Sequence, residues 1–167
     1  MLRILTLLLI TALAGQLYTY YPQLPDTLAT HFDGQGTANG WMSKKGYAIF
    51  TMGLTALLAA IFSFLPYWMR RLPAAWVNVP HKDYWLAEPQ RAQTLDFLDK
   101  QLSFIGIATI TFMIAVTQQV IKANLQAEAR LDNTFVWQLV AYMLFVFGMS
   151  AYIIWHFYRP PRDGAQL

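Results

Sequence analysis

The chain has 167 residues, of which 56% are hydrophobic and 13% are charged, with a net charge of +3 and no cysteine. Soluble domains average roughly 45–50% apolar and about 25% charged residues, so this composition does not suit a soluble surface. The lack of cysteine excludes disulfides, thiolate metal sites and cysteine nucleophiles.

The first apolar segment, residues 4–21, contains no charged residue. A helix of this length measures about 27 Å, close to the roughly 30 Å of a bilayer core. A secretory signal peptide is the alternative, with Arg3 as its positive start and residues 12–14 as a small-x-small cleavage site. Cleavage there leaves a signal shorter than the usual range of about 15–30 residues, so we favour an uncleaved membrane span.

The second uncharged segment, residues 46–69, predicts a second span with lysines before it and arginines after it. The next segment, residues 70–100, is polar and punctuated by proline, which predicts a structured loop. Within it, Pro89 predicts the start of a helix, and Leu95 and Leu98 follow at helical spacing. We expect an amphipathic helix that lies on the membrane surface and leads into the third span.

The third span, residues 101–121, carries hydroxyl and amide side chains, such as Thr109 and Gln118, that we expect to face neighbouring helices. The fourth, residues 133–158, has tryptophans near both ends, which is typical of membrane interfaces. These segments predict an all-α fold, an integral membrane four-helix bundle with an outer turn-rich loop and a cytoplasmic amphipathic helix. Four isolated glycines are expected to allow close helix packing, namely Gly15, Gly53, Gly106 and Gly148.

Lysine and arginine are distributed unequally between the two sides of the predicted membrane. Eight lie on the side of both termini and four on the opposite side, so the positive-inside rule places both termini in the cytoplasm. Their position beside the spans favours membrane topology over a nucleic-acid partner. The expected divisions are a two-span domain at 1–69 with its outer loop at 21–45, a cytoplasmic loop and surface helix at 70–100, and a two-span helical hairpin with a short cytoplasmic tail at 101–167.

The outer loop, residues 21–45, begins with two prolines and contains the pairs Asp33-Gly34 and Asn39-Gly40. Such pairs form turns because glycine and asparagine tolerate positive φ. A loop of this length usually has its own structure or a function. We therefore expect a compact, turn-rich loop.

The same loop resembles the signature LPxxxxxHFxxxGxxDxxxSK of bacterial membrane proteins of the domain of unknown function 1648 family, with Asn39 in place of the aspartate. The resemblance covers about residues 5–65, and residues 78–85 resemble an NxPxxxYW segment of a shorter subgroup. The matching positions are Leu24, Pro25, His31, Phe32, Gly36, Ser43 and Lys44, and Gly40 follows Asn39 as an Asn-Gly pair.

This resemblance implies a small multi-pass protein of the bacterial cytoplasmic (inner) membrane. SdpI-like members of the family protect cells from a secreted peptide toxin and sequester a cytoplasmic repressor. The resemblance therefore implies a binding, sensing or immunity role, with an extracytoplasmic ligand and a membrane or cytoplasmic protein partner.

His31 is the centre of the candidate ligand-binding site, because imidazole exchanges protons and ligates near neutral pH. The alternative, which we favour for this side chain, is that it bonds the backbone and pins the turn. One histidine without cysteine is a poor transition-metal site, so we expect no metal and no cofactor. A hard-cation site at Asp26 and Asp33 is a weaker alternative. The candidate residues are Asp26, His31, Phe32, Asp33, Gly36, Asn39 and Lys44.

The cytoplasmic segment offers a candidate docking site for a partner protein. Tyr84 and Trp85 lie beside Lys82 and Asp83 there, which also suits anchoring at the membrane surface and contact with helix ends, the interpretation we favour. The candidate docking residues are Lys82, Asp83, Tyr84, Trp85, Glu88 and Arg91.

The leading functional hypothesis is a non-enzymatic protein that binds the lipid bilayer and recognises an extracytoplasmic peptide, lipid or envelope component. The first alternative is a membrane enzyme or enzyme subunit that uses His31 as acid or base; no catalytic residue is otherwise assigned. The second is a structural accessory subunit of a membrane complex. The spans lack buried acids and bases, and an ion-coupled carrier normally needs an ionisable group inside the membrane, which argues against secondary transport.

Overall fold

A computed structural model of the chain describes residues 2–88 and 90–159. In this part of the chain, four helices are long and apolar enough to cross a membrane. The prediction of a multi-pass, all-α helical bundle is therefore confirmed. The four helices are α1 (Leu2–Tyr20), α2 (Lys44–Met69), α4 (Gln90–Asn124) and α5 (Asn133–Phe157).

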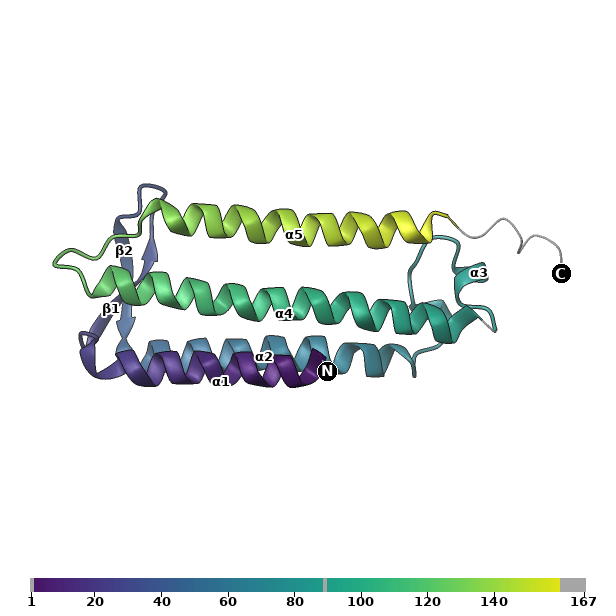
Figure 1. Cartoon of the computed structure of the whole chain (residues 1–167), viewed down its shortest axis with the longest axis horizontal. Helices are drawn as coiled ribbons and strands as arrows, with labels where there is room; N and C mark the ends of the chain where they lie inside the picture. Colours follow the sequence, from purple (N-terminus) through teal and green to yellow (C-terminus); the bar gives the residue numbers. More distant parts are fainter. Residues whose placement is uncertain (1, 89, 160–167) are drawn as a thin grey trace.

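Helix α4 lies at the centre of the bundle, with α1 and α2 on one side and α5 on the other (Figure 1). Gly106 explains how closely α2 approaches it, because a Cβ added there would lie 2.7 Å from the Cβ of Phe62. The prediction of close packing is thus right for Gly106. It is wrong for Gly15, Gly53 and Gly148, where an added Cβ would meet nothing within 4 Å.

Polar side chains inside the spans join α4 to its neighbours. Gln16 in α1 donates its side-chain N–H to the Gln118 oxygen at 2.6 Å, and the hydroxyls of Thr109 and Tyr142 in α5 lie 3.0 Å apart. Buried polar groups away from water need such partners. The expectation that Thr109 and Gln118 face other helices is correct.

Helix α4 is one continuous helix of 35 residues, about 52 Å long at about 1.5 Å per residue. The separate surface helix expected before the third span is therefore not present, and residues 90–100 extend the axis of the span instead. Leu95 and Leu98 are buried, and they pack against Trp85 and Phe157. The apolar face formed by these leucines therefore packs against other parts of the protein, where a membrane surface was expected. The predicted helix start at Pro89 lies outside the described residues.

The segment between α1 and α2 is more ordered than the expected turn-rich loop. A short 3₁₀ helix, η1 (Tyr21–Gln23), is followed by an antiparallel hairpin of β1 (Thr27–Phe32) and β2 (Ala38–Ser43). Leu28 is paired with Met42, and both pack into the core between α1, α2 and α4. This burial favours strands, although the three glycines and Asn39 suggested turns alone.

The opposite end of the bundle holds a short 3₁₀ helix, η2 (Ala74–Trp76), and the single-turn helix α3 (Lys82–Trp85). Arg70 at the end of α2 lies 2.6 Å from the Asp96 carboxylate of α4, which ties the two helices together there. We call the two ends the hairpin end and the α3 end (Figure 1).

Candidate functional site

The hairpin is fixed to α4 by one side chain. The Asn124 amide donates to the Ala29 carbonyl at 2.8 Å, and its oxygen accepts from the Ala29 backbone N–H at 2.8 Å. Ala29 is buried, so both of its backbone groups need a partner. Sequence reasoning missed Asn124, because an asparagine at a helix end is ordinary and its partner lies 95 residues away.

The tip of the hairpin is shaped by two of the predicted site residues. The Asp33 carboxylate accepts hydrogen bonds from the backbone N–H groups of Gln35 and Thr37, each at 2.9 Å. Gly36 adopts φ of 79° and accepts from the Leu131 N–H at 2.9 Å. An added Cβ at Gly36 would clash with the Leu131 carbonyl oxygen. Asp33 and Gly36 therefore build the turn and dock it on the connection between α4 and α5.

The base of the hairpin is held by a further predicted pair. The Lys44 ammonium lies 2.9 Å from the Asp26 carboxylate and 3.4 Å from the Leu24 carbonyl oxygen. The Lys44 backbone N–H also donates to the Asp26 carbonyl at 2.9 Å. Because the Asp26 side chain is almost fully exposed, solvent weakens this ion pair. The pair joins the two residues that flank the hairpin, one before β1 and one after β2.

His31 and Asn39 meet on the exposed surface of the hairpin. The His31 Nδ1 is hydrogen-bonded to the Asn39 amide oxygen, and because that oxygen can only accept, Nδ1 carries the proton. Gly40 makes room for this arrangement, since a Cβ there would lie 2.9 Å from the His31 Cβ. His31 thus bonds a side chain, whereas we had expected it to bond the backbone.

Trp41 is the exposed aromatic residue of β2, with 60% of its surface accessible, and sequence reasoning did not select it. It lies one residue from Gly40, the register partner of His31. Phe32, which was selected, packs instead against the buried core at the hairpin end. The structure therefore leaves His31, Asn39 and Trp41 exposed on the hairpin, where a ligand can reach them. The signal that could have found Trp41 is a tryptophan beside a turn-forming Asn-Gly pair.

The candidate docking residues at the α3 end fall into two groups. Trp85 is buried and donates its indole N–H to the Phe157 carbonyl at 3.0 Å, while Arg91 donates to the Leu72 carbonyl at 2.7 Å. Tyr84 is half-buried and makes an edge contact with Trp85. These three residues hold the loop on the ends of α4 and α5. The exposed group comprises Lys82, Asp83 and Glu88.

His156 near the end of α5 belongs to the same aromatic cluster. Its ring stacks on Phe97 with centroids 4.0 Å apart and lies 4.9 Å from the Trp85 ring. The cluster joins α3, α4 and α5. In residues 2–88 and 90–159, no group of three or more His, Asp or Glu side chains is placed to hold a metal ion.

Residues 6–57 match a family model described as Domain of unknown function (DUF1648). This segment is a DUF1648 domain. The DUF1648 domain comprises most of α1, the whole hairpin and the first half of α2. Asn124, which anchors the DUF1648 hairpin, lies outside it in α4. The chain has no significant match among curated proteins or among solved structures.

Proposed function

We propose that this protein is a non-enzymatic binding protein of the SdpI-like class that recognises an extracytoplasmic peptide, lipid or envelope component. In this proposal it lies in the bacterial inner membrane with the hairpin outside and both termini in the cytoplasm. The orientation is supported by the excess of lysine and arginine at the α3 end and in the segments that flank it.

The observation that carries the proposal is that His31, Asn39 and Trp41 are all exposed on an anchored hairpin, with His31 and Asn39 hydrogen-bonded to each other. Tryptophan contributes much of the binding energy in known interfaces, and the His31 imidazole on the same hairpin has a second ring nitrogen, Nε2, that can form a directed hydrogen bond. The Trp41 indole is apolar, and the His31 imidazole is a polar group held in place by Asn39. Together they suit a ligand that has both apolar and polar surface.

The anchoring of the hairpin also supports a binding role. Asn124 fixes its middle, the Leu131 N–H fixes its tip, and the ion pair of Asp26 with Lys44 closes its base. A surface held in one conformation loses little freedom when a ligand binds. Asp33 and Gly36, which build the turn, thus support the site indirectly because they fix the conformation of the hairpin.

A capture experiment with the full chain in detergent tests the proposal. We expect the wild type to enrich one envelope component, and His31→Ala and Trp41→Ala to lose it by about tenfold or more. Gln126→Ala is the control, since Gln126 is an exposed residue at the same end outside the hairpin. Equal capture by the three variants, with unchanged thermal unfolding, would contradict a binding role for the hairpin.

The role of accessory subunit has its own support in α5. This helix packs on α4, and many of its large apolar side chains remain exposed, including Trp137, Leu144 and Phe147. Lipid covers such a face in a lone protein, and another subunit covers it in a complex. Co-purification of a stoichiometric membrane partner that is lost with Leu144→Trp, but retained with His31→Ala, would favour this second function.

A further inference from the structure

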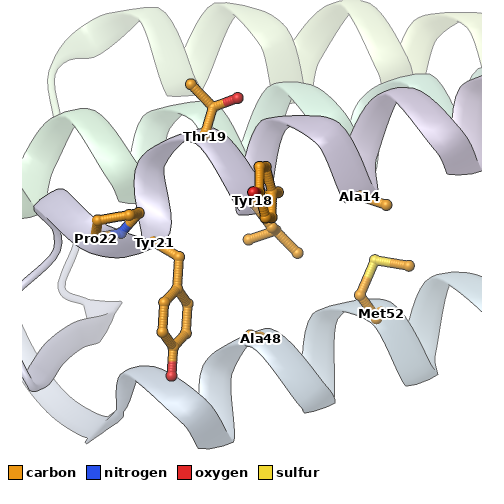
Figure 2. Close-up of a pocket in the computed structure, with 8 residues that line it drawn as sticks. Ala14, Tyr18, Thr19, Tyr21, Pro22, Ala48 and Met52 are labelled. Atoms are coloured by element: carbon orange, nitrogen blue, oxygen red, sulfur yellow. The ribbon is translucent and has the colours of Figure 1, made fainter.

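An open groove separates α1 from α2 near the hairpin end (Figure 2). Its volume is about 630 Å³, within the range of about 300–1,000 Å³ of pockets that bind small molecules. Small side chains, Ala14 on α1 and Ala48 on α2, leave the space between the helices. The buried side chain of Leu17 also lines it.

Tyrosine side chains frame the groove toward the hairpin end. Tyr21 extends from the end of α1 toward α2, and Tyr18 projects from the preceding turn with 85% of its surface exposed (Figure 2). Met52 lines the other end of the groove, on α2. The lining is therefore mostly apolar, with hydroxyl groups near one mouth.

The depth of the groove matches one leaflet of a bilayer. Ala14 lies six residues before the end of α1 at Tyr20, and Met52 lies eight residues after the start of α2 at Lys44. At about 1.5 Å per residue, the groove reaches about 9–12 Å from the helix ends, less than half of a core of roughly 30 Å. Because both helices are membrane spans, the open side faces hydrocarbon, and an acyl chain has the right chemistry to fill it.

Two lysines at the start of α2 precede Ala48, which lines the groove. The Lys44 ammonium lies 5.4 Å from the centre of the Tyr21 ring, and the neighbouring Lys45 is exposed. Asp26 neutralises one of these two cations through its ion pair with Lys44. The remaining charge at this depth complements a lipid phosphate.

We propose that this groove binds one acyl chain of an anionic glycerophospholipid from the leaflet at the hairpin end, with the lipid phosphate beside Lys45. The groove holds the chain by apolar contact, and the lysines select the headgroup. The site is distinct from the exposed residues His31, Asn39 and Trp41, so this inference goes beyond the proposed function and does not depend on it.

Native mass spectrometry of the full chain with added phosphatidylglycerol or phosphatidylcholine tests the site. We expect one phosphatidylglycerol to stay bound preferentially, and Ala48→Trp, which fills the groove, to reduce its retention by about tenfold. Ala56→Trp is the matched control, because Ala56 is an exposed alanine of the same helix that does not line the groove. Lys45→Gln should abolish the preference for phosphatidylglycerol, whereas Lys122→Gln, at an exposed lysine of α4, should leave it intact.

A second measurement uses the wild type alone, so it does not rely on a tryptophan variant that folds. Phosphatidylglycerol with a photoreactive group in its acyl chain should label Tyr18 or Met52 after illumination in nanodiscs. Equal retention of both lipids, equal retention by both tryptophan variants, labelling spread evenly over all four spans, or a dimer in place of the lipid adduct would each overturn the proposal.

Discussion

The side-chain amide of Asn124 makes two hydrogen bonds to the backbone of Ala29, and so connects the end of the longest helix to the middle of the hairpin. Asn124→Ala would leave a buried N–H and a buried carbonyl without this partner. We expect a local loss of about 2–4 kcal/mol, since each unsatisfied buried group costs about 1–3 kcal/mol.

Amide hydrogen exchange of residues 27–43 measures this loss, and we expect faster exchange there with little change in α5. Gln126→Ala is the control, because Gln126 is exposed and close in sequence. Unchanged exchange in the hairpin of the Asn124 variant would show that other contacts are sufficient to anchor it.

Gly36 should tolerate substitution far less well than Gly34. Gly36 has positive φ and faces the Leu131 carbonyl oxygen, whereas an added Cβ at Gly34 would meet nothing within 4 Å. We expect Gly36→Ala to cost at least about 1–2 kcal/mol and Gly34→Ala to cost much less. Thermal unfolding in detergent compares the two, and equal midpoints would contradict the docking of the turn on residue 131.

Trp85→Phe should loosen the α3 end of α5. The variant keeps an aromatic ring but loses the N–H that donates to the Phe157 carbonyl, a change that should cost about 1–2 kcal/mol. Trp76→Phe is the control, since Trp76 is exposed. The measurement is hydrogen exchange in the last turns of α5, and equal protection in the two variants would disprove the role of the indole N–H.

The start of α5 should depend on pH through Asp132. Hydrogen bonds from the hydroxyl and the backbone N–H of Thr134 hold the pKa of the Asp132 carboxyl below its usual value. A pKa lowered by folding means that the stabilisation is present above the unfolded value of about 3.9 and is lost as the pH falls through the folded-state pKa.

We therefore expect the first turn of α5 to exchange faster as the pH is lowered from 6 toward 3, after correction for the intrinsic pH dependence of exchange. Asp132→Asn retains a good capping residue that does not titrate, so protection of the first turn of α5 against exchange should not change with pH in this variant. A parallel decline in both proteins would assign the effect to another group.

Local composition was sufficient to predict the long helices. Apolar segments without charge can satisfy their backbone in a bilayer only as helices or closed barrels, so residues 46–69 and 133–158 were identified close to the observed ends of α2 and α5. His31 and Asn39 of the candidate site were selected from the sequence because the motif around them is local, whereas Trp41 was not selected.

Tertiary contacts decided how that loop is folded and which of its residues are exposed. The hairpin depends on Leu28 in the core and on Asn124, whose partner lies 95 residues away, and no local pattern encodes such a pairing. Distant contacts also decide the packing of α4. Its Leu95 and Leu98 pack against Trp85 and Phe157, where a membrane surface was expected. The sequence by itself determined which segments avoid water, because hydrophobicity is a property of each residue. The tertiary structure decided what each segment packs against, because that depends on residues distant in the chain.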